Sequence, residues 1–295
     1  MTEQKKSGVV FHPDRPITTE EEDSLGFGII SDNLASSILN AGAREGFVIG
    51  IEGAWGCGKS SIVNLLCTKI EDKKKLSVVK FAPWIIGNRD NMLASLMADL
   101  SAAIEAVEGP QKKGELSTAD KLRKYGALIG RVSSPLAALA AFAPGAEIPA
   151  KIVQEIAEKL SKADQTQPQP LVDMKEELTG ALRKLGQTFV VVVDDIDRLE
   201  PAETVEIMRL IRAVGDFPNV IYVLCYDKDI LTSSLESALK IKNGSSFLQK
   251  IVQASFAVPK PEEFDLRRWL NKECQRLYEI VTGETLSEEQ ADKLN

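Results

Sequence analysis

The sequence predicts an α/β fold in which helices cover both faces of a mainly parallel sheet, a three-layer arrangement. Residues 189–193 (FVVVV) and 220–225 (VIYVLC) carry no charge, which is typical of strands buried on both faces, as in parallel sheets. A third apolar run, residues 47–51, leads through a glycine-rich turn into a helical pattern. Strands that alternate with helices are typical of parallel sheets, so the three runs together favour this fold.

The composition of the 295 residues is that of a soluble protein with one large domain or two modest ones. The net charge of -7 and the pI near 5.1 argue against bulk electrostatic binding of nucleic acid, although a local basic groove stays open. The four cysteines show no CxxC pattern and no signal peptide is visible in the first residues, so we expect reduced thiols and a cytoplasmic protein. The single histidine, His12, lies in a polar leader, which argues against a histidine-based catalytic or metal site.

The first elements are an arm and a helix. Residues 1–23 are polar and end in an acidic run, so we expect them to form a flexible arm. A helix should follow, because Leu34, Ile38 and Leu39 recur at helical spacing, and Asp32 is the expected cap.

The glycine-rich turn is the most informative stretch of the chain. Residues 53–60 (GAWGCGKS) fit the pattern GxxxxGK[ST], between a strand and a helix as that pattern requires. The glycines let backbone N–H groups point inward, and the start of the helix adds its positive dipole end, so the loop suits the phosphates of ATP. The candidate nucleotide-binding residues are Gly53, Trp55, Gly56, Cys57, Gly58, Lys59, Ser60 and Ser61.

Individual residues of this loop have predicted roles. Lys59 is expected to reach the terminal phosphates, Ser60 to ligate Mg2+ and Ser61 to reach the α-phosphate. Cys57 is open to oxidation, but its uncharged surroundings favour a small loop filler. Residues 25–27 lie just upstream of the strand, in a segment that contributes to the adenine pocket in many ATPases with this loop. Apolar loop residues more often pack against the rest of the protein, so a plain packing role is favoured.

The next elements follow the alternating pattern. A helix is predicted over residues 59–70 and a second strand over 77–82, which Pro83 ends because it has no N–H for the sheet. Trp84 then lies at the carboxyl edge, where ligands bind to parallel sheets, and either shapes the site or covers the core. An amphipathic helix is predicted over residues 89–107.

Residues 109–170 exceed what a crossover needs and predict a helical insertion. Within it, residues 126–146 are apolar and approach the length of a membrane span. They include Arg131, Pro135 and many alanines, so we favour a helical hairpin packed on the core or on a partner over membrane contact. A further helix is expected near residues 152–160.

A pair of carboxylates follows the apolar run 189–193, after a helix predicted over residues 171–185. Adjacent Asp194 and Asp195 are costly there unless a cation is near, so the pattern indicates a Walker B motif. Asp194 would hold Mg2+, and Asp195 would orient or deprotonate the attacking water. Arg198 either pairs with an acidic neighbour or senses a phosphate or a neighbouring subunit.

Two further regions carry candidate residues. A helix predicted over residues 202–214 holds Arg209 and Arg212, and both are candidate arginine fingers. Asp227 follows the strand at 220–225 and has two alternative roles. It either contacts the γ-phosphate or its water, or it caps the next helix. The remaining predicted elements are a strand at 254–258, an amphipathic helix at 264–280 and, over 271–295, the start of a C-terminal helical region.

Five strings together resemble the KAP family of P-loop NTPases over roughly residues 24–270. They are GAWGCGKSS, FAPW, VVVVDDIDRLEP, VLCYDKD and FLQKIVQ. The resemblance implies a sheet of order 5-1-4-3-2, Asp194 on Mg2+, Asp195 beside the water, and an insertion between the second strand and Walker B. In many members the insertion carries membrane helices. Bacterial members often belong to anti-phage defence systems, in which the ATPase works with an effector or assembles into rings.

We therefore expect an Mg2+-dependent ATPase that acts as a nucleotide-driven switch or assembly ATPase in a bacterial anti-phage defence complex. Its expected partners are other copies of the chain or an effector protein. Two alternatives stay open: an ATP-gated scaffold with little turnover, and a DNA-stimulated motor, which the acidic balance disfavours.

Overall fold

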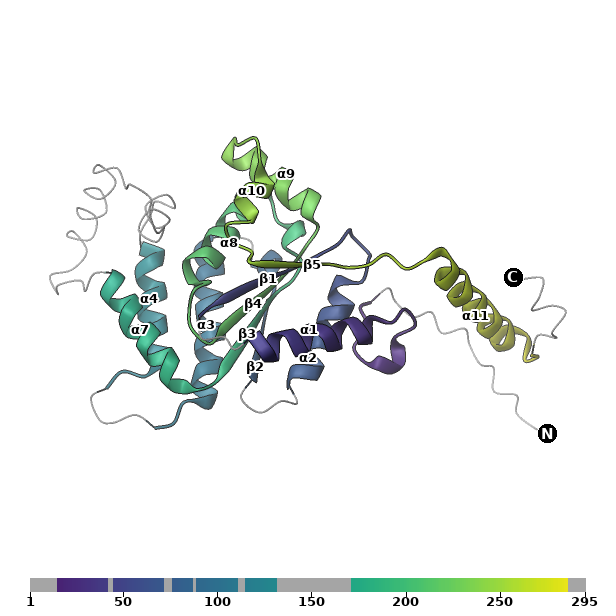
Figure 1. Cartoon of the computed structure of the whole chain (residues 1–295), viewed down its shortest axis with the longest axis horizontal. Helices are drawn as coiled ribbons and strands as arrows, with labels where there is room; N and C mark the ends of the chain where they lie inside the picture. The colour runs from purple at the N-terminus through teal and green to yellow at the C-terminus, as the bar shows by residue number, and fades with distance from the viewer. Residues whose placement is uncertain are drawn as a thin grey trace.

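The computed structural model describes residues 15–41, 45–71, 76–86, 89–110, 115–131 and 171–285. In this part of the chain, one sheet of five strands has the order β2-β3-β4-β1-β5, and every neighbouring pair is parallel (Figure 1). The predicted α/β fold and the order 5-1-4-3-2 are confirmed. The strands are β1 (Phe47–Glu52), β2 (Leu76–Phe81), β3 (Thr188–Val193), β4 (Val220–Tyr226) and β5 (Ala254–Ala257).

Helices cover both faces of the sheet. α1 and α2 pack on one face, whereas α3, α8 and α9 cover the other, with α4 packed on α3 and α7 on α4. The helices are α1 (Phe27–Ala41), α2 (Lys59–Glu71), α3 (Arg89–Val107), α4 (Thr118–Arg131), α7 (Leu171–Leu185), α8 (Pro201–Val214), α9 (Lys228–Leu239), α10 (Gly244–Leu248) and α11 (Glu263–Thr282). Short 3-10 turns are η1 (Glu20–Glu22), η2 (Pro83–Ile85) and η3 (Ile196–Arg198).

The apolar run of β3 supplies both cores at once. Phe189, Val191 and Val193 enter the core under α3 and α8, while Val190 and Val192 enter the core under α1 and α2. Successive side chains of a strand point to opposite faces, so an uncharged run is needed where both faces are covered. This arrangement confirms the interpretation of the run as a doubly buried strand.

Helix α1 begins earlier than the sequence analysis predicted. Its first residue is Phe27, so Asp32 lies within the helix and is not its cap. Asp32 pairs instead with Lys69 of α2, at 2.6 Å. The capping contacts come from Asp23, whose carboxylate accepts hydrogen bonds from the N–H groups of Leu25 and Gly28. Aspartate caps well, and the acidic run that we assigned to the arm contains this cap.

The last part of the predicted arm lies against α2. The backbone N–H of Ile17 donates to Ser61 Oγ at 3.3 Å, and Asn64 Nδ2 donates to the carbonyl of Ile17 at 3.2 Å. Glu20 of η1 pairs with Lys69 of the same helix. Residues 15–23 are therefore attached to the helix that follows the glycine loop, whereas residues 1–14 lie outside the described residues.

The insertion is described only at its two ends. Helix α4 lies within the predicted helical insertion and includes the start of its apolar part, and its Leu122 and Tyr125 are buried against the core. The rest of the predicted hairpin and the helix expected near residues 152–160 lie outside the described residues. In the part of the chain that the structure describes, no helix has both the length and the apolar character to cross a membrane.

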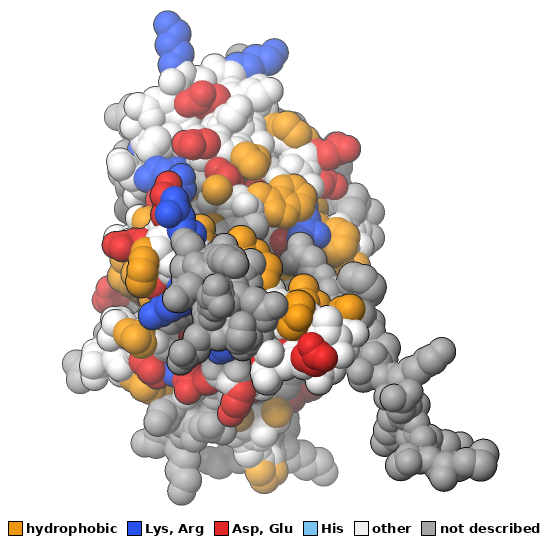
Figure 2. All heavy atoms as spheres, turned by 90° about the vertical axis from the view of Figure 1, so that its right-hand side faces the viewer, with side chains coloured by type: hydrophobic (Ala, Val, Ile, Leu, Met, Phe, Trp, Pro, Cys, Tyr) orange, Lys and Arg blue, Asp and Glu red, His pale blue; other side chains and the backbone are white. Residues whose placement is uncertain are grey.

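Helix α11 extends away from the sheet, on the side opposite α4 and α7 (Figure 1), and none of its residues is buried. Its apolar side chains include Leu266, Leu270, Leu277 and Val281, which are 41 to 68% exposed. Figure 2 views the molecule from this side and shows hydrophobic side chains exposed among charged ones. The helix was predicted, but its distance from the core was not.

Substitution of Gly50 in β1 tests how closely this residue packs against the Tyr226 side chain of β4. A Cβ atom at Gly50 would lie 2.3 Å from the Tyr226 hydroxyl, so we expect Gly50→Ala to lower the free energy of unfolding by about 1–3 kcal/mol, the usual cost of overpacking. The matched control is Gly180→Ala in α7, where no neighbour lies within 4 Å. Because alanine reduces the conformational freedom of the unfolded chain, this control should raise the free energy of unfolding by about 0.5–1 kcal/mol. Urea unfolding measures both changes, and equal effects would contradict the described packing of Gly50.

Candidate functional site

The glycine loop joins the end of β1 to the first turn of α2. Gly56 and Gly58 have φ angles of 77° and 97°, in the left-handed region that glycine adopts without steric cost. A Cβ at Gly58 would lie 2.5 Å from the ring of Phe27, so α1 packs directly against the loop. A Cβ at Gly53 would lie 2.3 Å from the sulfur of Cys57, which fills the inside of the turn. Phe27 and Cys57 thus pack within the protein.

A cavity of about 200 Å3 lies between this loop and the residues that follow β3. Most of the predicted site residues meet there. The cavity is lined by Arg15, Pro16, Trp55, Gly56, Gly58, Lys59, Ser60, Ser61, Asp195, Asp197 and Arg198. Of the residues assigned to the phosphate loop, to Mg2+ or to the attack on the γ-phosphate, those that do not line it are Gly53, Cys57, Asp194 and Asp227. The further candidates that do not line it are residues 25–27, Trp84, Arg209 and Arg212.

The sheet topology brings these segments together. The carboxyl ends of parallel strands lie at one edge, where ligands bind in open α/β sheets. The N–H of Gly53 donates to the carbonyl of Tyr226 at 3.1 Å, which ties the start of the loop to the end of β4. The N–H of Asp194 donates to the carbonyl of Phe81 at 3.3 Å, which fixes the end of β3 against β2.

The Lys59 ammonium group lies at the inner wall of the cavity. Its Nζ donates to the carbonyl oxygens of Gly53, at 2.8 Å, and Ala54, at 3.3 Å. It also lies 3.3 Å from Oδ2 of Asp197, and the two side chains are only 10% and 6% exposed. The loop lysine is therefore held by the loop itself and by a buried carboxylate, which the sequence analysis did not assign.

Asp195 is held in an unusual backbone conformation. Its φ angle is 59°, which few residues other than glycine adopt, although aspartate and asparagine do so more readily than most. Burial raises the pKa of its carboxyl above the ordinary value of 3.8, and the neighbouring Asp194 carboxylate adds to the effect, while Arg198 opposes it. Oδ1 of Asp195 lies 2.8 Å from Nε of Arg198. A carboxyl group with a raised pKa beside a phosphate-binding loop suits acid–base work on water.

Arg198 is flanked by two exposed indole rings. Its guanidinium carbon lies 5.3 Å from the ring centre of Trp55 in the glycine loop and 5.3 Å from that of Trp84 in η2. These distances fall within the range of cation–π attraction. Two roles were left open for Arg198, and in the structure it pairs with an acidic neighbour, Asp195. Trp84, whose role was also left open, lies at the site and is 44% exposed.

Asp227 makes the contacts of a helix cap. Its Oδ1 accepts hydrogen bonds from the N–H groups of Asp229 and Ile230 in the first turn of α9. Its own N–H donates to Oδ2 of Asp197 at 3.1 Å. A role toward the γ-phosphate stays a prediction. Arg209, one of the two finger candidates, pairs with Glu206 at 2.9 Å.

Sequence reasoning missed the contribution of the segment before α1. Arg15 and Pro16 line the cavity, although both were assigned to the arm. The Ser61 hydroxyl, predicted to reach the α-phosphate, accepts the N–H of Ile17, and this bond leaves its own hydrogen free to donate. Asp197 was readable as the third acid of the DDxDR string, but no sequence rule gave it a role.

The two predicted Mg2+ ligands carry oxygen donors, the type that this ion takes, and of the two only Ser60 lines the cavity. The predicted protein ligands are Ser60 and Asp194, and Mg2+ in phosphoryl-transfer sites is usually held by one or two protein groups, waters and the phosphates. Among the described residues, no group of three or more histidine, cysteine, aspartate or glutamate side chains is placed to hold a metal ion.

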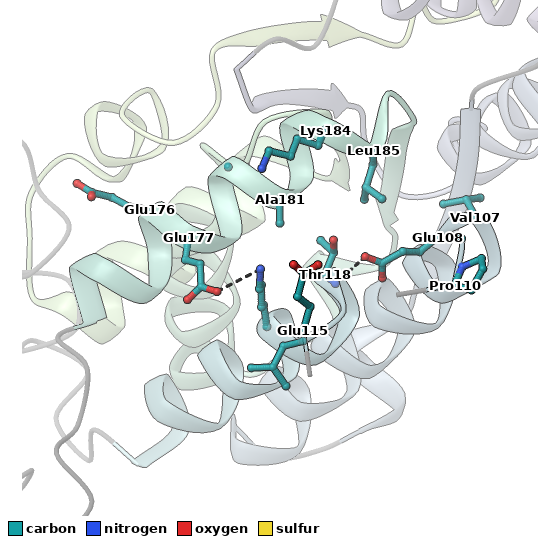
Figure 3. Close-up of a pocket in the computed structure, with 14 residues that line it drawn as sticks. Val107, Glu108, Pro110, Glu115, Thr118, Glu176, Glu177, Ala181, Lys184 and Leu185 are labelled. Atoms are coloured by element: carbon teal, nitrogen blue, oxygen red, sulfur yellow. Dashed lines mark hydrogen bonds and ion pairs between the residues drawn. The ribbon is translucent and has the colours of Figure 1, made fainter. Parts of the chain in front are cut away.

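A second cavity of about 920 Å3 lies between the end of α3, the start of α4 and α7 (Figure 3). Its walls carry acidic side chains, among them Glu115 and Glu176. Glu108 accepts the N–H of Thr118, and Lys121 pairs with Glu177 at 3.1 Å. These contacts join the helices that form the cavity, and we assign it no ligand.

A glycine loop between a strand and a helix, facing acidic residues at the same sheet edge, defines the chain as a P-loop nucleotide-binding domain. The chain belongs to the KAP family: the model of the KAP family P-loop domain matches residues 27–295.

A phage exclusion protein and an ORC2 protein are among the known proteins that are similar to this chain. The Phage T7 exclusion protein of Escherichia coli (strain K12) is 34% identical over 285 residues, which are 92% of this chain and 38% of that protein. The chain thus spans well under half of that relative. The structure of the Aeropyrum pernix ORC2 protein (ADPNP-ADP complexes) aligns over 98% of this chain and 70% of that chain, with 10% sequence identity and a TM-score of 0.40. Such a distant likeness supports no conclusion about function.

The raised pKa of Asp195 predicts a pH-dependent stability difference. Between 3.8 and the raised pKa the native protein binds more protons than the unfolded chain, so stability falls as pH rises through this interval. At pH 7 we expect Asp195→Asn to have a larger free energy of unfolding than the parent. This gain in stability should shrink as the pH is lowered toward 3.8. Urea unfolding across this pH range measures the difference.

The control for this prediction is Asp120→Asn. A hydrogen bond from the Ser117 hydroxyl lowers the pKa of Asp120, so its replacement should reduce stability at pH 7. A gain of Asp195→Asn that is independent of pH would contradict the titration and indicate relief of backbone strain alone.

Proposed function

We propose that the chain is an Mg2+-dependent ATPase that acts as a nucleotide-driven switch. The observation that carries this proposal is that Lys59, Ser60 and Asp195 line one cavity at the carboxyl edge of the sheet. Phosphoryl transfer from a P-loop depends almost entirely on positioning and electrostatics, and these groups can provide both.

The loop would bind the triphosphate. Backbone N–H groups of residues 54–56 and 58 and the N-terminus of α2 suit negative charge, whereas those of Gly53 and Cys57 already donate to carbonyl oxygens. Lys59 would move its ammonium group from the loop carbonyls to the terminal phosphates. Ser61 would donate to the α-phosphate. The cavity of about 200 Å3 is smaller than the range of about 300–1,000 Å3 typical for whole ligands, so it suits the phosphate chain. The base would then lie toward residues 15 and 16.

The acidic segment would act on water. Ser60 and Asp194 would hold Mg2+, which neutralises charge on the phosphates when it is bound. Asp195 would orient or deprotonate the attacking water, for which a raised pKa is suited. Its pair with Arg198 would have to loosen for the carboxylate to reach the water. Arg198 would then be placed to follow the charge of the phosphates.

The biological role follows by analogy with the phage exclusion relative. We propose that the switch acts in anti-phage defence in the cytoplasm, through other copies of the chain or an effector protein. The domain would span residues 24–270, with a helical insertion at 109–170 and the start of a helical region at 271–295. The alternatives are an ATP-gated scaffold and a DNA-stimulated motor.

Two substitutions test the assignment of the nucleotide site. Lys59→Ala should abolish nucleotide binding, and Asp195→Asn should retain bound ATP while hydrolysis falls by at least about a hundredfold, as for loss of one transition-state contact. Calorimetry with a non-hydrolysable ATP analogue measures binding, and phosphate release measures turnover. Lys121→Ala is the control, because this lysine pairs with Glu177 in α7 and should leave both unchanged.

Several outcomes would overturn the proposal or its parts. If Lys59→Ala hydrolysed ATP as fast as the parent, the assigned site would be wrong. Single-turnover hydrolysis, measured beside particle mass with and without ATP, separates a working ATPase from a scaffold that only assembles. Stimulation by DNA would favour the motor.

The anti-phage role has a separate test in bacteria. Cells that express the complete protein should resist phage, and the Lys59→Ala protein at equal abundance should not protect, because the switch would lack nucleotide. The measurement is plaque formation against cells with Lys121→Ala as the matched control. Equal protection by the Lys59→Ala protein would show that defence does not require this site.

A further inference from the structure

Asp197 is a buried carboxylate at the site that the proposed mechanism does not use. Its side chain is 6% exposed, and it lies in η3, two residues after Asp195. A buried ionised carboxylate is costly unless it is paired and hydrogen-bonded. The contacts of Asp197 therefore indicate what it does.

One oxygen of Asp197 joins two parts of the site. Oδ2 lies 3.3 Å from the Lys59 ammonium nitrogen and accepts the N–H of Asp227 at 3.1 Å. Lys59 belongs to the loop that would bind phosphate, and Asp227 caps α9 through the N–H groups of Asp229 and Ile230. A single carboxylate thus connects the loop lysine to the start of α9.

We propose that Asp197 is a positioning residue that holds the Lys59 ammonium group in the nucleotide-free protein, in direct competition with the phosphates of an incoming nucleotide. The inference rests on the proposed function, because it takes the competing ligand to be a nucleoside triphosphate. A phosphate chain that binds Lys59 has to remove the ammonium group from Asp197, and it brings further negative charge close to that carboxylate.

The competition also connects nucleotide binding at the loop with the start of α9. When Lys59 turns to the phosphates, Asp197 keeps only the N–H of Asp227 among the two contacts of Oδ2. Occupancy of the loop would therefore change the charge balance around the carboxylate that is bonded to the start of α9. By linkage, the same Lys59–Asp197 contact that weakens nucleotide binding is weakened by the nucleotide.

Two substitutions of Asp197 separate these contacts. Asp197→Asn removes the charge that holds Lys59 but keeps an oxygen that accepts the N–H of Asp227. Asp197→Ala removes both contacts. If the role of Asp197 were only structural, both variants would be less stable than the parent and neither would bind nucleotide more tightly. Competition predicts instead that Asp197→Asn binds nucleotide more tightly.

The test uses the full chain in two measurements. The first is a double-mutant cycle of Lys59→Met and Asp197→Asn on urea unfolding without nucleotide, for which we expect a coupling of at least about tenfold in the unfolding equilibrium constant. The second is calorimetric titration with a non-hydrolysable ATP analogue and Mg2+. The dissociation constant of Asp197→Asn should be about tenfold lower than that of the parent, the size of one charge-assisted contact. Asp229→Asn, an exposed acid at the start of α9, is the control and should change affinity little.

Each result decides between support and rejection. Coupling together with tighter binding by Asp197→Asn supports the proposal. Absence of coupling overturns it whatever the affinity, and so does coupling with unchanged or weaker binding, or an equal gain in Asp229→Asn. If the parent binds no nucleotide, the proposed function fails. In that case, binding by Asp197→Asn alone would support the competition, and binding by neither would reject both.

Discussion

The parallel pairing of β1 with β4 is the constraint on which the site depends. The pairing runs to Glu52 opposite Tyr226, and the hydrogen bond from Gly53 to Tyr226 continues it into the loop. On its other side, β1 pairs with β5, and the N–H of Val258 donates to the carbonyl of Glu52 at 2.8 Å. The strand that carries the glycine loop is therefore held on both sides at the point where the loop begins, so the loop starts from a fixed position.

The sequence was sufficient for the core of the fold because its signals there are local and strong. The uncharged run of β3, the stop at Pro83 after β2 and the helical spacing of α3 each specify an element without reference to distant residues. The meeting of the glycine loop with Asp195 also followed, since the ends of parallel strands share an edge. Strand order needed the family resemblance, because periodicity does not tell which strands are neighbours.

What the sequence did not reveal depends on contacts between distant segments. The attachment of residues 15–23 to α2 rests on single contacts, such as the hydrogen bond of Ile17 with Ser61 and the ion pair of Glu20 with Lys69, which leave no pattern in the chain. The start of α1 was misplaced because Asp23 and Asp32 are equally good caps by type, and only packing distinguishes them. The contact of Asp197 with Lys59 joins η3 to the first residue of α2, two segments far apart in the chain, and a third aspartate after a strand has no role by rule.

The two indole rings beside Arg198 are an intrinsic fluorescence probe of the site. The chain has three tryptophans, and two of them, Trp55 and Trp84, flank this guanidinium group beside the cavity, while Trp269 lies on α11. Indole emission depends on nearby charge and on solvent, so movement of Arg198 alters the light from two rings at once. Events at the loop thus have a spectroscopic signature that needs no dye and no modification of the chain.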